Sequence, residues 1–188
     1  MSSKNDKFYL KLALNLAKQH EGLTNENPSV GCVIVKDNKI LSLSKTSISG
    51  RPHAEDNAIR FANTNDLKGS TIYVTLEPCT HHGKTPPCTD LIIKKKISKI
   101  VYASNDIDER TANKLKKVLK NHNISTKQIR MKEITDFYKS YFFIRKNKFP
   151  YITAKLACSN DYYIYSKKNK NITNELSRKT SHLLRYKN

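Results

Sequence analysis

The residues best suited to chemistry in this sequence are one histidine, one glutamate and two cysteines. His53 stands two positions before Glu55, and Cys79 and Cys88 lie further along in a polar stretch punctuated by prolines. One imidazole and two thiolates suit tetrahedral zinc with a fourth position open for water. Zinc lowers the pKa of its bound water to roughly 7, which provides a nucleophile at neutral pH. The spacing therefore predicts a catalytic zinc site held by His53, Cys79 and Cys88.

Glu55 is the candidate proton carrier beside this metal. It is not needed as a ligand, and a carboxylate near the metal can accept a proton from water and return it to a leaving group. A histidine, a glutamate two residues later and a following Pro-Cys pair form the signature of zinc deaminases. The alternative is a closed structural zinc site with His81 or His82 as the fourth ligand, which leaves Glu55 without a purpose.

Alternating helical and strand patterns surround these residues. Apolar residues at helical spacing predict helices over 6–19, 53–62, 87–95, 111–120 and 133–146. Apolar, β-branched runs between turn residues predict strands over 29–35, 39–44, 71–76, 99–104 and 126–131. Helices that alternate with strands imply an α/β domain with helices on both faces of one sheet.

The C-terminal section is expected to differ from the rest. A strand over 151–158 and a helix over 174–186 are predicted, with a charged, asparagine-rich stretch at 167–171 that we expect to be mobile. One strand and one helix cannot enclose a core. We therefore expect a domain over 1–146 and an incomplete piece over 147–188.

The length, charge and cysteine content of the sequence limit its possible functional classes. The 188 residues suit about one domain, and the longest charge-free apolar run is far shorter than the roughly 20 residues that a membrane helix needs. The net charge of +19 suits a polyanionic partner, but there is no arginine-rich block or basic–aromatic pattern, so nucleic acid is not the expected partner. Four cysteines without a secretory signal indicate a reducing compartment, the cytoplasm. Cys32 and Cys158 are expected to be core thiols.

Three segments resemble a known family. The sequence of 75–88, Thr-Leu-Glu-Pro-Cys-Thr-His-His-Gly-Lys-Thr-Pro-Pro-Cys, closely resembles the deaminase domain of the riboflavin-biosynthesis protein RibD. Asn-Pro-Ser-Val-Gly-Cys at 27–32 and His-Ala-Glu at 53–55 extend a resemblance that covers about residues 6 to 145. Other zinc deaminases usually place two residues between their cysteines, whereas eight separate Cys79 and Cys88.

The resemblance implies a three-layer α/β/α, cytidine-deaminase-like sandwich around a mixed sheet. It implies zinc held by His53, Cys79 and Cys88, with Glu55 as the proton donor. The implied reaction is hydrolytic deamination of diaminohydroxyphosphoribosylaminopyrimidine to the amino-ribosylamino-uracil phosphate. The positions that match the family's substrate pocket are Asn27, His81 and Lys84. A homo-oligomer is compatible with this interpretation.

Two segments depart from the family pattern. Thr46 stands where family members usually carry a histidine, and the loop 105–113 lacks the usual Asp-Pro pair and glycine. These changes concern loop shape and substrate affinity rather than the metal chemistry.

The C-terminal section resembles the start of the family's reductase domain. Residues 151–161 are similar to its first strand, and Arg185 matches an arginine that contacts substrate phosphate there. No glycine-rich phosphate loop is present, so we do not expect reductase activity from this chain. A separate or missing reductase is the implied partner. The alternative functions are a nucleoside or nucleic-acid base deaminase and a non-catalytic zinc-bearing scaffold.

Overall fold

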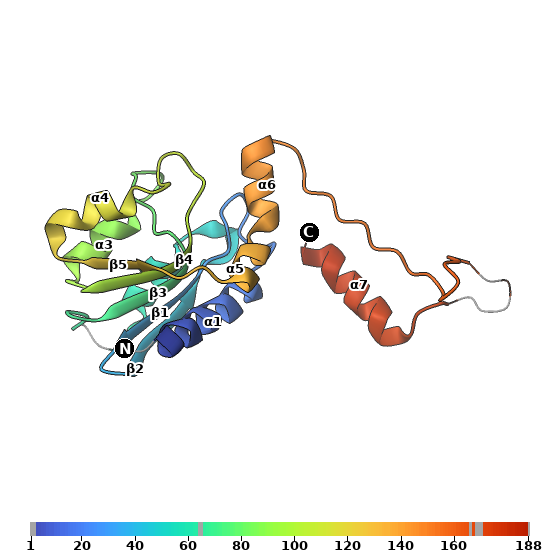
Figure 1. Ribbon diagram of the computed structural model, residues 1–188, viewed down its shortest axis with the longest axis horizontal. Coiled ribbons are helices and arrows are strands. Elements are labelled where there is room, and N and C mark those ends of the chain that lie inside the picture. The colour runs from blue at the N-terminus through green and yellow to red at the C-terminus, as the bar shows by residue number, and fades with distance from the viewer. Residues whose placement is uncertain (1–2, 64–65, 166, 168–170, 188) are drawn as a thin grey trace. The chain divides into compact units, whose positions relative to one another are not determined.

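A computed structural model describes residues 3–63, 66–165, 167 and 171–187 of the chain (Figure 1). The chain divides into two compact units, Met1–Phe149 and Pro150–Asn188. All of the sheet and six of the seven α-helices formed by the described residues belong to the first unit.

One mixed sheet organises the first unit. Its strands are β1 (Gly31–Lys36), β2 (Lys39–Lys45), β3 (Thr71–Leu76), β4 (Lys99–Ser104) and β5 (Ser125–Gln128). They lie in the order β2-β1-β3-β4-β5, with β1 antiparallel to both of its neighbours and with β3, β4 and β5 parallel. The central strands are buried almost throughout, as their runs of aliphatic and β-branched residues predict.

Helices cover both faces of this sheet. The helices of the first unit are α1 (Ser3–Gln19), α2 (Ala54–Arg60), α3 (Cys88–Lys94), α4 (Leu115–Leu119), α5 (Lys132–Phe137) and α6 (Lys139–Asn147). Figure 1 shows α3 and α4 on one side of the sheet and α1 and α5 on the other. Because α2 contacts both β1 and α3, it belongs to the layer of α3 and α4. The expected three-layer α/β/α arrangement is confirmed.

A glycine lets α1 approach the sheet closely. A Cβ atom at Gly31 would lie 1.8 Å from the carbonyl oxygen of Ala13, so no other residue fits at this point of β1 without displacing the helix. Leu10 and Ala13 on the inner side of α1 are fully buried against the sheet. This packing fixes the start of β1, and with it the segment that precedes the strand.

An ion pair with a buried carboxylate also connects α1 to the sheet. The Asp6 carboxylate accepts hydrogen bonds from the Tyr73 hydroxyl, at 2.9 Å, and from Lys127 Nζ, at 2.7 Å. Burial alone would raise the pKa of Asp6, but the hydrogen bonds from Lys127 and Tyr73 outweigh it and lower the pKa below its ordinary value. The ionised carboxylate is therefore part of the folded core.

Several boundaries differ from the sequence-based expectations. The helix expected over 133–146 is two helices, α5 and α6, which meet at Tyr138. The Tyr138 side chain is buried there, and its hydroxyl donates to the carbonyl oxygen of Ser29 at 3.0 Å. The helix expected over 111–120 begins only at Leu115, because residues 105–114 form a loop that belongs to the candidate site.

The second unit contains one helix among its described residues, α7 (Glu175–Lys187), close to the helix expected over 174–186. The strand expected over 151–158 was a wrong prediction, because the described backbone has no partner strand there and its apolar side chains, such as Ile152 at 83 %, are exposed. Cys158 is likewise exposed rather than a core thiol, whereas Cys32 is buried. Residues 168–170, within the stretch expected to be mobile, lie outside the described residues. No helix among the described residues has the length and apolar character to cross a membrane.

Candidate metal centre and active site

Three elements bring His53, Cys79 and Cys88 together. His53 immediately precedes α2, Cys79 follows β3 in the connecting loop, and Cys88 is the first residue of α3. Their ligand atoms all lie within 4.8 Å of one another, and the described residues contain no other such group of potential metal ligands. The sequence motif therefore corresponds to one compact cluster in space.

The spacing within this cluster fits tetrahedral zinc. His53 Nδ1 lies 3.6 Å from Cys79 Sγ and 3.4 Å from Cys88 Sγ. Sulfur at about 2.3 Å and nitrogen at about 2.0 Å from a common tetrahedral centre lie roughly 3.5 Å apart. The cluster therefore fits Zn²⁺ in both donor type and geometry.

The two thiols also favour a cation between them. The hydrogen bond with Cys88, supported by His53, lowers the pKa of the Cys79 thiol to about 4. The same sulfur–sulfur contact, together with burial, raises the pKa of Cys88. The Cys88 N–H also donates to Cys79 Sγ at 3.2 Å. A dication between the two sulfur atoms stabilises both thiolates.

Glu55 lies on the second residue of α2, beside the ligand cluster, and its side chain is almost fully buried. Burial raises the pKa of Glu55 to about 7. Its position allows proton transfer at the cluster, and it is not one of the three grouped ligands.

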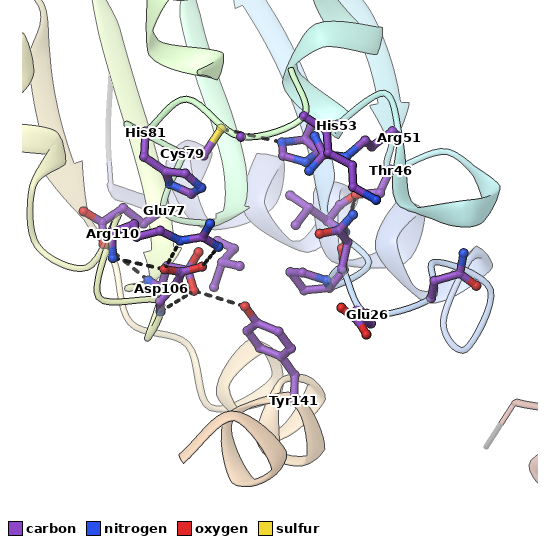
Figure 2. A pocket seen from close by; sticks show the side chains of 18 of the residues that line it. Glu26, Thr46, Arg51, His53, Glu77, Cys79, His81, Asp106, Arg110 and Tyr141 are labelled. Atoms are coloured by element: carbon purple, nitrogen blue, oxygen red, sulfur yellow. Dashed lines mark hydrogen bonds and ion pairs between the residues drawn. The ribbon is translucent and has the colours of Figure 1, made fainter. Parts of the chain in front are cut away.

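A cavity of about 710 Å³ opens onto the cluster (Figure 2). It lies beyond the C-terminal ends of β3 and β4, the edge of an α/β sheet at which ligand sites commonly form. Most of the side chains around it are polar or charged, and they include His53, Glu55 and Cys79. The volume and lining suit a polar small molecule rather than a lipid.

The three residues expected in a substrate pocket all line this cavity, namely Asn27, His81 and Lys84. Asn27 Nδ2 donates to the Gly50 carbonyl oxygen at 3.1 Å. His81 Nδ1 lies 2.9 Å from Thr111 Oγ1. Arg185 is on α7 in the second unit and is not among the lining residues.

Neither candidate for a fourth protein ligand joins the metal cluster. His81 is engaged with Thr111, and the exposed His82 lies 3.8 Å from Asp90. The closed structural site considered from the sequence therefore finds no support among the described residues. A cluster of three protein ligands is compatible with water as the fourth ligand of the metal.

Thr46, at the position where the resemblance led us to expect a histidine, also lines the cavity. Its side chain is buried, and its hydroxyl accepts the Val30 N–H at 2.9 Å. The hydroxyl thus completes the backbone hydrogen bonds at the start of β1.

Glu77, which the sequence reasoning did not single out, organises one wall of the cavity. Its carboxylate accepts the backbone N–H groups of Asp106 at 3.3 Å, Asn113 at 3.2 Å and Leu115 at 3.3 Å. Burial raises the pKa of Glu77. The residue directly precedes the Pro-Cys pair of the motif, and that adjacency was the available sequence signal.

Helix α6 supplies a further part of the cavity lining, for which no local signal existed in the sequence. The Tyr141 hydroxyl donates to Asp106 Oδ1 at 3.2 Å (Figure 2). Arg145 Nη2 donates to the Glu26 carbonyl oxygen at 2.9 Å, and its guanidinium lies 5.7 Å from the centre of the Tyr141 ring. Helix α6 thus bridges two loops at the mouth of the cavity.

Comparison with known proteins agrees with this geometry. The family model for the cytidine and deoxycytidylate deaminase zinc-binding region matches residues 3–104, more than half of the chain. RibD of Aquifex aeolicus is 42% identical over 183 residues, which cover 96% of this chain and 51% of that protein. The diaminohydroxyphosphoribosylamino-pyrimidine deaminase of Buchnera aphidicola subsp. Acyrthosiphon pisum is 42% identical over 147 residues, or 78% of this chain and 99% of that protein.

Solved structures give the same result. RibD of Acinetobacter baumannii has a TM-score of 0.84 and 33% identity, covering 97% of this chain and 52% of that one. The Thermotoga maritima deaminase/5-amino-6-(5-phosphoribosylamino)uracil reductase has a TM-score of 0.85 and 35% identity. The match covers 95% of this chain and 52% of that one. The chain spans about half the length of the first curated relatives that it matches. The chain therefore belongs to the cytidine-deaminase-like zinc family, in the group of RibD and the diaminohydroxyphosphoribosylamino-pyrimidine deaminases.

Proposed function

We propose that this chain is a zinc-dependent hydrolase of riboflavin biosynthesis. It deaminates diaminohydroxyphosphoribosylaminopyrimidine to the amino-ribosylamino-uracil phosphate. The observation that carries the proposal is the buried Glu55 carboxyl beside a zinc-fitting cluster at a polar cavity. The names of the relatives supply the substrate.

In the proposed mechanism, His53, Cys79 and Cys88 hold the metal. Bound zinc supplies a Lewis acid that makes water nucleophilic at neutral pH. Glu55 accepts a proton as water adds to the ring carbon that bears the amino group. It then delivers that proton to the amino nitrogen, and the carbon–nitrogen bond breaks. The substrate and one water thus become the uracil product and ammonia.

The remaining pocket residues are proposed to orient the substrate. The Asn27 side chain, held by its bond to the Gly50 carbonyl group, presents its amide to the pyrimidine edge. His81 is held by Thr111, and Lys84 provides a cation for a carbonyl group or the phosphate. The proposed ligand is accordingly a phosphorylated pyrimidine.

We also propose a division of the chain by role. Residues 1–146 are the deaminase domain, and 147–188 are the N-terminal piece of a reductase-like domain in which Arg185 occupies a substrate-contacting position. Support comes from the similarity to Aquifex RibD, which continues across 96% of this chain while covering about half of that protein. The reduction step then requires a reductase outside these residues. The proposed location is the cytoplasm, where both ligand thiols stay reduced.

The test is a turnover assay with the purified, zinc-loaded protein. Ammonia release from diaminohydroxyphosphoribosylaminopyrimidine is expected, with zinc at one per chain. Release from cytidine or an oligonucleotide, but not from the riboflavin intermediate, would favour a nucleoside or nucleic-acid base deaminase. Stoichiometric zinc without turnover of any of these compounds would favour a scaffold.

A further inference from the structure

One corner of the cavity gathers positive charge from two separate segments of the chain. Arg51 lies just before α2, Lys84 lies in the loop between Cys79 and Cys88, and both line the cavity. Arg51 Nη1 donates to Thr85 Oγ1 at 2.7 Å, so the guanidinium reaches across to that loop. Among the described residues, neither Arg51 nor Lys84 forms an ion pair with a carboxylate. Their charge is thus available to a ligand.

Gly83 leaves a space beside this guanidinium. A Cβ atom placed at Gly83 would lie 3.8 Å from Arg51 Nη2 and 3.8 Å from His81 Nε2. His81 Nδ1 is bonded to Thr111 Oγ1, so Nε2 is the ring nitrogen on the side of Gly83. Nitrogen atoms of two side chains from different segments, Arg51 and His81, therefore border the position that a side chain at Gly83 would occupy. An anionic oxygen accepts hydrogen bonds from a guanidinium at about 2.8 Å.

The other side of the cavity has the opposite character. Glu77 and Asp106 lie there, and Arg110 is paired with Asp108 through its guanidinium. Arg145 stacks on Tyr141 and donates to a backbone carbonyl group. A phosphate dianion is repelled by the acidic wall and attracted to the Arg51 corner. A phosphoryl group is therefore expected at the Arg51 corner rather than beside Glu77 and Asp106.

We infer that Arg51, held by Thr85 beside the space left by Gly83, binds the phosphoryl group of the substrate and makes the enzyme selective for phosphorylated pyrimidines. A guanidinium forms paired hydrogen bonds with phosphate oxygens, which a lysine cannot reproduce. The Thr85 hydroxyl accepts a hydrogen bond from Arg51 Nη1 and thereby positions the guanidinium. This inference rests on the proposed function and extends it from the pyrimidine ring, where the reaction occurs, to the phosphate end of the substrate.

The closing experiment compares Arg51→Gln with Arg60→Gln, a matched loss of charge at an exposed arginine paired with Asp56 on α2. KM and kcat are measured for the phosphorylated substrate and for its dephosphorylated riboside. We expect Arg51→Gln to raise KM for the phosphorylated compound about 10- to 100-fold, the range for charge-assisted hydrogen bonds. The riboside should be nearly unaffected, and zinc content and kcat should be retained. Arg60→Gln should have the same KM and kcat as the wild type for both compounds.

Two further variants sharpen the test. Gly83→Ala should raise KM for the phosphorylated substrate by filling the space. The KM of Arg51→Lys for this substrate should lie between those of the wild type and Arg51→Gln. Equal effects of Arg51→Gln on both compounds, or an unchanged KM, would overturn the inference. So would a loss of phosphate preference in Arg145→Gln rather than in Arg51→Gln, because that result places the phosphoryl group beside α6.

Inorganic phosphate provides a readout that does not depend on turnover. Its binding is followed by ³¹P line broadening in the zinc-loaded wild type and in Arg51→Gln. If the wild type binds phosphate in an Arg51-dependent manner but deaminates nothing, the proposed function fails while the anion site stands. If the wild type deaminates the substrate and Arg51→Gln behaves identically in both assays, only the anion site fails.

Discussion

The backbone N–H of Asp106 donates to Glu77 Oε2 at 3.3 Å, which connects the loop after β4 to the residue that precedes the Pro-Cys pair. The same carboxylate accepts N–H groups from Asn113 and from Leu115, the first residue of α4. One buried side chain therefore determines the shape of the loop that departs from the family pattern. It does so next to the metal cluster.

Replacement of Glu77 by glutamine should release this loop while leaving the metal in place. Glutamine presents an N–H₂ group to backbone donors, and an unsatisfied buried donor costs about 1–3 kcal/mol. We expect KM to rise about tenfold or more, with kcat and zinc content nearly unchanged and with faster tryptic cleavage after the exposed Arg110. Glu133→Gln, an exposed charge loss on α5, is the control. An unaltered KM together with unaltered proteolysis would contradict the role assigned to Glu77.

Glu55→Gln separates proton transfer from metal binding. Because Glu55 is outside the ligand group, zinc should remain at one per chain while kcat falls roughly a hundred- to ten-thousand-fold. The neighbouring Asp56→Asn removes a surface ion pair with Arg60 and serves as the control. Zinc loss in Glu55→Gln, or near-normal turnover, would show that the proton carrier is another residue. The measurements are metal analysis and steady-state ammonia release.

The ligand assignment predicts coupled losses of metal and stability. Cys79→Ser and Cys88→Ser should each lower zinc occupancy and the midpoint of thermal unfolding, because metal binding contributes to folding. Cys158→Ser, at an exposed cysteine in the second unit, should change neither. Full zinc occupancy in both ligand variants would require a different ligand set.

The Asp6 ion pair predicts a pH-dependent contribution to stability. The folded-state pKa of Asp6 lies below its ordinary value, so its stabilisation is complete above the ordinary pKa of about 3.9 and is lost as pH falls through the folded-state pKa. We expect Asp6→Asn to lower the unfolding free energy by about 1–3 kcal/mol near neutral pH. The difference from wild type should shrink below about pH 4.

Chemical denaturation at several pH values measures this difference, and acid effects on the zinc ligands cancel because both proteins share them. Asp136→Asn, at an exposed position of α5, is the control. A difference between Asp6→Asn and wild type that grows on acidification would refute the assignment.

Deletion of 150–188 should leave deamination within about twofold of the full chain. All residues that line the cavity lie before position 150, and α6 supplies its closing wall. A chain that ends at residue 138 loses Tyr141 and Arg145, and we expect it to lose activity. Neither the full chain nor the shorter one should oxidise NADPH in the presence of the deaminated product. Collapse of deamination in the longer truncation would assign the second unit a role in the reaction.

The sequence alone was sufficient to predict the fold class and to single out the residues of the candidate zinc site. His53, Glu55, Cys79 and Cys88 stand in a local motif whose donor types already indicate zinc, and the structure brings the three ligands into one group. Alternating helices and strands were predictable as well, because apolar periodicity is a property of neighbouring residues. For the same reason, a three-layer α/β fold could be expected before any contact was known.

The walls of the cavity were decided only by the tertiary structure. Arg51 meets Thr85 across 34 positions of the sequence and Tyr141 meets Asp106 across 35, and no local pattern encodes such pairs. Tyr138 lies where an apparently continuous helix divides into α5 and α6, and its hydroxyl bonds to Ser29, more than a hundred positions away. Residues 151–158 have a strand-like sequence but form no strand, since a strand exists only when a neighbour satisfies its backbone hydrogen bonds. Local sequence specifies which groups are available, whereas packing between distant segments determines which of them meet.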